Sequence, residues 1–112
     1  MEQDCVPPNQ CTTMAEVRNG VDRLDRELIA LLGQRFRYMD AAARIKTARG
    51  AVRDEGRKAE VLANARAAAA GAGVPDEVVA ALWETLVEGS IAYELERFDA
   101  QRAARNRPEA AE

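Results

Sequence analysis

The chain has no histidine among its 112 residues, and it has only two cysteines. Without histidine it lacks the usual proton shuttle and the base that activates a serine or cysteine nucleophile. Cys5 and Cys11 lie close together in a polar N-terminal stretch, with no further cysteine and no histidine to complete a zinc site. We therefore expect no metal site and no disulfide or zinc role for these two residues.

The sequence also lacks a long apolar run of the roughly 18 residues that a membrane-spanning helix needs. Residues 1–13 have neither the basic start nor the apolar centre of a signal peptide. We expect no membrane association and a cytoplasmic location. The net charge is −3, and acidic and basic residues are interleaved along the chain. Because nucleic-acid-binding proteins usually carry a clustered basic face, we expect no nucleic-acid partner.

Aromatic residues are few, at 4%, while alanine is abundant. A core of Leu, Val, Ile and Ala at close helix contacts favours an all-α fold, and the length fits one domain. We expect a flexible leader over residues 1–13, a helical domain over 14–105 and a frayed tail over 106–112.

The apolar spacing predicts three helices, in the order long, short, long. Thr13 and Glu16 form a capping-box pattern, after which apolar residues recur every three or four positions to about Lys46. Residues 47–54 are predicted to form a loop and residues 55–70 a second helix, which Gly71 and Gly73 end. A third helix starts near Pro75 and continues to about residue 105. The first helix, about 50 Å long, is too long to bury its stripe within this chain, which implies a homodimer with paired first helices.

Three cations are set into the first predicted helix. Arg35 and Lys46 are 11 residues apart, which places them about 20° apart around the axis and about 16 Å apart along it. Arg18 lies about 25 Å from Arg35 along the same axis. In an antiparallel pair of first helices, Arg18 of one chain can reach the Arg35 and Lys46 face of the other. Cations without a general base suggest a site that binds an anion and holds it in a folded conformation.

Two polar residues interrupt the apolar stripe of the third predicted helix. Ser90 and Glu94 are four apart, on one face, beside Val87 and Ile91. Buried carboxylates are rare unless they are paired or protonated. Periodicity alone leaves a simpler alternative open, in which the three cations are solvated and Ser90 and Glu94 lie at the edge of the stripe.

The stretch from Val17 to Lys46, VRNGVDRLDRELIALLGQRFRYMDAAARIK, resembles the first helix of the all-helical chorismate mutases and of the related isochorismate pyruvate lyases. The similarity continues through VRDEGR at Val52 to Arg57 and through Ser90 to Glu94. This resemblance implies an intertwined helical homodimer with two identical sites that bind a small dicarboxylate, chorismate or isochorismate. No cofactor is implied.

The resemblance also implies roles for individual residues. Arg18 from the partner chain would hold one carboxylate and Arg35 the other, and Arg57 would help to hold a carboxylate from the second helix. Lys46 would donate to the enolpyruvyl ether oxygen and a carboxylate. Asp54 would lie near the ring hydroxyl, Ser90 near a ring carboxylate and Glu94 near the ether oxygen. The implied reaction is the pericyclic rearrangement of chorismate to prephenate, in which negative charge builds on the ether oxygen and a fixed ammonium stabilises it.

Two residues depart from the usual mutase pattern. An ionised Glu94 would repel the developing charge, so we expect Glu94 to work in its protonated form and turnover to fall as pH rises. Lys58 stands where typical mutases have a glutamate that accepts a hydrogen bond from the substrate's ring hydroxyl. The lyases also lack this glutamate. Asp54 and Ser90, however, look more like the mutases, and we place mutase first and isochorismate pyruvate lyase, giving salicylate and pyruvate, second. A mutase for the 4-amino analogue of chorismate and a noncatalytic helical sensor or interaction module are further alternatives.

Overall fold

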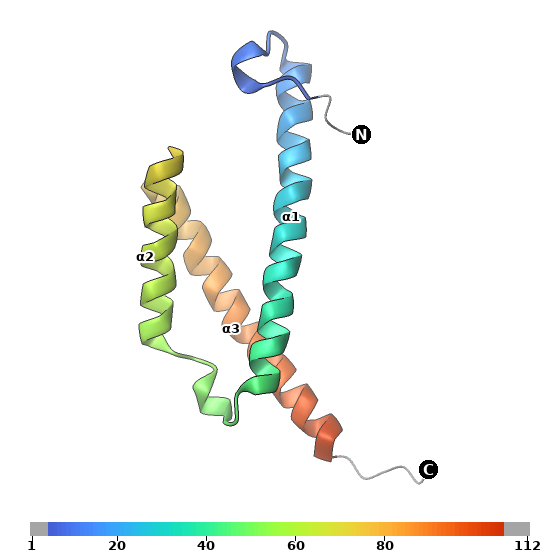
Figure 1. The fold of residues 1–112 in the computed structure, drawn as a ribbon, viewed down its shortest axis with the longest axis vertical. Coiled ribbons are helices and arrows are strands. Elements are labelled where there is room, and N and C mark those ends of the chain that lie inside the picture. The colour runs from blue at the N-terminus through green and yellow to red at the C-terminus, as the bar shows by residue number, and fades with distance from the viewer. Residues whose placement is uncertain (1–4, 107–112) are drawn as a thin grey trace, which may run out of the picture. The chain divides into compact units, whose positions relative to one another are not determined.

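The computed structural model describes residues 5–106, and all the regular structure in that part of the chain is helical (Figure 1). A short 3-10 helix, η1 (Pro8–Gln10), precedes the long helix α1 (Met14–Ile45). A second 3-10 helix, η2 (Arg49–Ala51), leads to α2 (Glu55–Ala72) and then to α3 (Asp76–Asn106). The predicted all-α class and the order long, short, long are confirmed. Residues 1–4 of the predicted leader and 107–112 of the predicted tail lie outside the described residues.

The chain divides into two compact units, Met1–Arg37 and Tyr38–Glu112. In the first unit, α1 begins with the capping box that the sequence predicts. The Glu16 N–H donates to Thr13 Oγ1 at 3.1 Å, while the Glu16 carboxylate accepts from the backbone N–H groups of Thr12 and Thr13. These backbone hydrogen bonds, first that of Thr12, lower the pKa of Glu16. The backbone N–H groups of Thr12, Thr13 and Glu16 are thereby satisfied.

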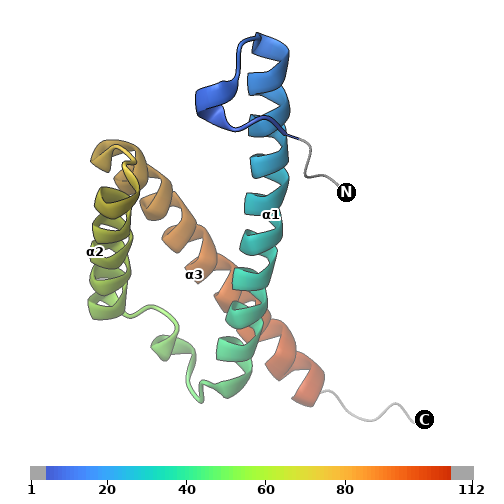
Figure 2. The same ribbon diagram turned by 45° about the horizontal axis from the view of Figure 1, so that its top comes forward.

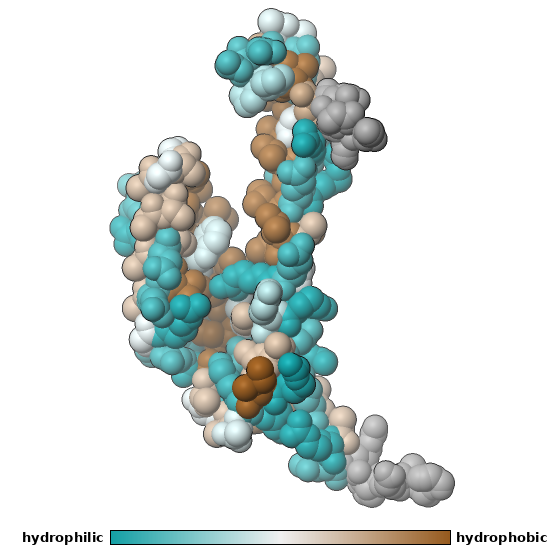
Figure 3. All heavy atoms as spheres, viewed as in Figure 1, coloured by the Kyte–Doolittle hydropathy of each residue, from teal (hydrophilic) through white to brown (hydrophobic). Residues whose placement is uncertain are grey.

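The apolar stripe of α1 is exposed over its first five turns. Its members are between 39% and 58% exposed: Met14, Val17, Val21, Leu24, Leu28 and Leu31. Ala43, near the far end, is the one buried residue of this helix. Figure 3 shows apolar side chains gathered along this part of α1. An exposed apolar face of this length is typical of a surface that another protein chain covers.

The second unit has its own core. Buried residues from the end of α1, from the segment before α2 and from α3 form one cluster, whose members are Ala43, Val52, Val87, Ile91 and Phe98. Val61 and Leu62 of α2 and Trp83 and Leu95 of α3 pack against it. Helices α2 and α3 lie side by side in both views (Figures 1 and 2). Among the described residues, no helix is both long enough and apolar enough to cross a membrane.

The ends of α2 follow from a few residues. The Asp54 side chain caps the first turn by accepting from the Arg57 N–H at 3.0 Å. The helix continues two residues beyond the predicted Ala70, because Gly71 stays helical and only Gly73, at φ 74°, takes the left-handed conformation that ends it. Pro75 then precedes the first residue of α3.

Candidate active site

Lys46 and Glu94 form a part-buried charged pair in the second unit. Lys46 directly follows α1, and its N–H donates to the Ala42 carbonyl at 2.9 Å, which continues the helical pattern. Its ammonium donates to Glu94 Oε2 at 2.7 Å. The Glu94 side chain is only 6% exposed, against 30% for Lys46. A charge-assisted contact this short is strong, and it compensates a carboxylate that would otherwise be buried alone.

Ser90 lies one turn before Glu94 on α3 and is also buried. Its hydroxyl donates to the Leu86 carbonyl at 2.7 Å. Val87 and Ile91, on the same side of the helix, belong to the core. Ser90 and Glu94 therefore face the interior. The alternative that places these two residues at the edge of the stripe is wrong.

Asp54 and Arg57 lie at the start of α2, Asp54 as its N-cap and Arg57 in its first turn. Asp54 is engaged as the helix cap, since its side chain accepts from the Arg57 N–H and its carbonyl accepts from the Lys58 N–H. The guanidinium of Arg57 pairs with Glu60 at 2.9 Å, and both side chains are exposed. The structure of the single chain thus does not bring Arg57 into contact with Lys46 and Glu94.

Arg18 and Arg35 belong to the first unit, where both lie on α1. Arg18 is exposed, and Arg35 is half-buried and partnered. Seventeen residues of continuous helix separate them, which is about 25 Å. Two groups that far apart on one rigid helix cannot grip the same small molecule.

Three groups of ion pairs, which sequence reasoning missed, join the segment before and at the start of α2 to α3. Arg49 binds Asp99, Arg53 binds Glu88, and Lys58 binds both Glu84 and Glu88. Glu88 accepts from two cations at once, and their hydrogen bonds, first that of Arg53, lower its pKa to about 2. The sequence signal for these ion pairs is the acidic pair Glu84 and Glu88, four residues apart on one helix face.

Arg102 of α3 was also missed, and it contacts the end of α1. Its guanidinium donates to the carbonyl oxygens of Ala43, at 3.1 Å, and of Lys46. The same group lies over the ring of Phe98, 3.8 Å from its centroid. The spacing of four between Phe98 and Arg102 was the visible signal of the stacking, but it says nothing about the carbonyl partners.

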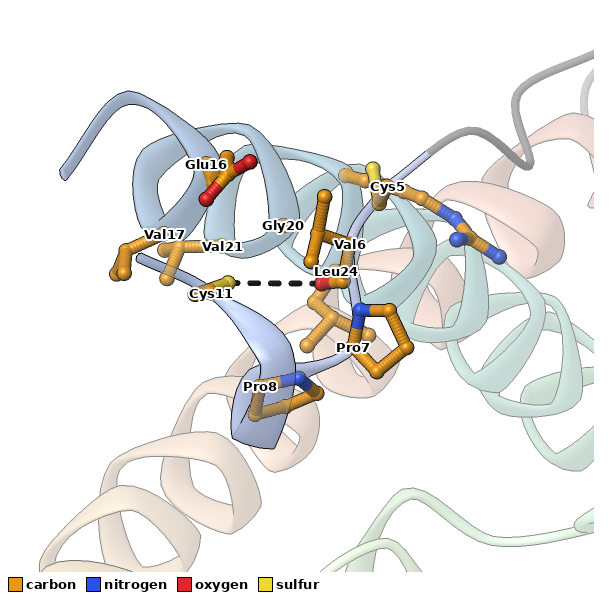
Figure 4. A pocket seen from close by; sticks show the side chains of 11 residues that line it. Cys5, Val6, Pro7, Pro8, Cys11, Glu16, Val17, Gly20, Val21 and Leu24 are labelled. Atoms are coloured by element: carbon orange, nitrogen blue, oxygen red, sulfur yellow. Dashed lines mark hydrogen bonds between the residues drawn. The ribbon is translucent and has the colours of Figure 1, made fainter. Parts of the chain in front are cut away.

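A cavity of about 440 Å³ lies in the first unit, between residues 5–11 and the first turns of α1 (Figure 4). Its lining is mainly apolar and includes both cysteines. The Cys5 thiol donates to the Asn19 carbonyl and the Cys11 thiol to the Val6 carbonyl. The cavity holds none of the predicted site residues, and among residues 5–106 no cluster of three or more metal-binding side chains occurs.

The fold and these contacts define an all-helical protein without histidine, whose candidate site pairs a lysine at the end of a long helix with a buried glutamate. The sequence profile of the family described as chorismate mutase type II matches residues 17–95, a range that includes both Arg18 and Glu94. The chain belongs to this family. It is also similar to an isochorismate pyruvate lyase of Pseudomonas aeruginosa, with 29% identity over 97 residues that cover 87% of this chain and 96% of the lyase.

Proposed function

We propose that the protein is a chorismate mutase that converts chorismate to prephenate. Membership of the chorismate mutase type II family supports an enzyme that acts on chorismate or on isochorismate. The observation that carries the proposal is the Lys46 ammonium, which lies 2.7 Å from buried Glu94 and remains 30% exposed. It is thus fixed in place and still open to an anionic oxygen of a substrate.

The mechanism needs neither a nucleophile nor a metal. In the proposal, Arg35 binds one carboxylate of the substrate, Arg18 of the second protomer binds the other, and Arg57 helps to hold a carboxylate. Clamping both carboxylates holds the substrate in its folded conformer, which removes an entropic part of the barrier. Lys46 then donates to the ether oxygen as its bond to the ring breaks, and stabilises charge that is present only in the transition state.

Glu94, Ser90 and Asp54 complete the proposed site. Glu94 accepts from the Lys46 ammonium at 2.7 Å and is proposed to lie near the ether oxygen. Ser90 lies one turn away on the same buried face and is proposed to contact a ring carboxylate. Asp54, at the start of α2, is proposed to lie near the ring hydroxyl.

The proposed site requires a homodimer. Arg18 lies too far along α1 from Arg35 to act within one chain, whereas an antiparallel second copy of α1 brings it to the opposite site. The exposed stripe of α1 supplies the surface for this pairing, since its apolar side chains are uncovered in the single chain. Two first helices packed along their stripes would bury these residues and form two identical sites.

The second candidate is isochorismate pyruvate lyase, which forms salicylate and pyruvate. Two observations favour it: the similarity to the Pseudomonas aeruginosa lyase over nearly its whole length, and the position of Lys58. The Lys58 ammonium binds Glu84 and Glu88 at 3.0 and 2.7 Å. A cation held in this way offers no acceptor for a ring hydroxyl at the place where typical mutases have a carboxylate.

One pair of assays tests the proposal. The purified protein is incubated with chorismate and, separately, with isochorismate, and prephenate, salicylate and pyruvate are measured. We expect prephenate from chorismate at the higher kcat/KM. Salicylate formation at the higher kcat/KM would instead establish the lyase, and no turnover of either compound would support a noncatalytic module. Lys46→Ala should abolish turnover, while Arg66→Gln, which removes a surface pair with Asp76, serves as the control and should leave it unchanged.

A further inference from the structure

We propose that Arg102 is a positioning residue for Lys46. This inference rests on the proposed function, in which the Lys46 ammonium meets the reacting ether oxygen. Arg102 itself touches no substrate atom in this proposal. It acts by fixing the backbone from which the lysine side chain extends.

The contact exists because α1 ends at this point. The last carbonyl groups of a helix have no partner within it, and those of α1 include the carbonyl of Ala43. The Arg102 guanidinium donates to Ala43 and to Lys46 at once. Guanidinium is planar and carries five N–H donors in a rigid fork, so that one group can bridge two acceptors at a defined separation.

The guanidinium is itself held in place. It lies over the ring of Phe98, 3.8 Å from the centroid, and Phe98 is a buried member of the core. The cation is therefore braced by a side chain that cannot move without disturbing the packing of α3. Helix α3 thereby supplies a rigid support for the end of α1.

Helix α3 holds Lys46 at both ends. Glu94 binds the ammonium, and Arg102, eight residues later and about 12 Å further along the helix, binds the carbonyl. The lysine side chain consequently extends along α3 from Arg102 toward Glu94. A lysine has four rotatable side-chain bonds, so a well-defined ammonium position requires that both ends are fixed.

The main test compares Arg102→Gln with Arg105→Gln, the same substitution at an exposed arginine in the last turn of α3. A displacement of about 1 Å at a reacting group can cost about a hundredfold in rate, so we expect kcat of Arg102→Gln to fall by about tenfold or more. KM should change by less than about threefold, because the lysine's role at the ether oxygen is realised mainly in the transition state. Arg105→Gln should match the parent protein. A kcat for Arg102→Gln within about twofold of the parent would overturn the proposal.

Chemical rescue separates positioning from simple loss of stability. Arg102→Ala leaves space beside Phe98, and low millimolar guanidinium chloride should restore part of its kcat, whereas potassium chloride at the same concentration should not. Arg102→Lys should lie between Arg102→Gln and the parent, because one ammonium lacks the planar fork that bridges the two carbonyls. A fall in kcat that tracks a lower unfolding midpoint and shows no guanidinium rescue would overturn the assignment.

Amide hydrogen exchange at Lys46, whose N–H donates to the Ala42 carbonyl, gives a readout that does not depend on turnover. Lys46 carries one of the anchored carbonyls, so exchange of its amide should accelerate in Arg102→Gln and stay unchanged in Arg105→Gln. If the parent protein converts neither compound but this exchange still accelerates, the proposed function fails and the hold of Arg102 on Lys46 stands. Unchanged exchange in Arg102→Gln would overturn the hold itself.

Discussion

The two partners of the Lys46–Glu94 pair should respond unequally to replacement. Two unit charges 2.7 Å apart attract by about 6 kcal/mol at an effective dielectric constant of about 20, and much of that is cancelled by the cost of burying the carboxylate. Lys46→Met leaves a carboxylate that is 6% exposed without compensation, which should cost about 3 kcal/mol of unfolding free energy. Glu94→Gln leaves an ammonium that already reaches water and should cost about 1 kcal/mol.

The double variant makes this asymmetry a sharp test. With both charges removed, no isolated charge stays buried, so we expect a loss of about 2 kcal/mol, which is less than the sum of the single losses. The unfolding free energies are measured by urea denaturation with far-UV circular dichroism, at neutral pH and one fixed protein concentration because association affects stability. If Lys46→Met costs no more than Glu94→Gln, or if the losses add, then the pair is not the buried, coupled contact that we describe.

Three further predictions concern acid, helix ends and association. The pKa of Glu88 is lowered to about 2 from its ordinary value of 4.5, so its contribution to stability is complete above about pH 4.5 and is lost as pH falls toward 2. The urea midpoint of unfolding should therefore fall less over this pH range in Glu88→Gln than in the parent protein. Gly73→Ala should lower the unfolding free energy by about 1 kcal/mol because φ there is 74°, whereas Gly71→Ala, at a helical position, should not lower it. Thermal unfolding of the two variants checks the contrast. Leu28→Glu should abolish self-association in analytical ultracentrifugation, whereas Ala30→Glu, exposed about 200° away around α1, should retain it; a dimeric Leu28→Glu protein would contradict the proposed pairing of first helices.

Local signals in the sequence account for most of the fold. The Thr13 and Glu16 pattern predicts the start of α1, and the Asp54 to Gly73 interval contains α2 because a side-chain cap and a left-handed glycine define its two ends. These features act over a few residues and can be recognised without knowing which other segments of the chain pack against them. The predicted end of α2 was too early because two glycines were available, and only the conformation of the backbone distinguishes Gly73 from Gly71.

The candidate site was only partly accessible to the same reasoning. The burial of Ser90 and Glu94 follows from helical periodicity, since they share a face with Val87 and Ile91. The partner of Glu94 is 48 residues away, and that of Arg102 lies 56 residues away at the Lys46 carbonyl. Such pairs depend on how the helices meet in space, which periodicity along one helix does not encode.

The ion pairs between the start of α2 and α3 make the protein sensitive to salt. Arg49, Arg53 and Asp99 are exposed, so their attractions are screened over about 10 Å once ionic strength reaches about 0.1 M. The proposed dicarboxylate substrate would be drawn to the cations of the site under the same screening. Catalysis in dilute buffer would therefore exceed catalysis at the ionic strength of a cell, and the difference would appear first in the substrate concentration needed for half-maximal rate.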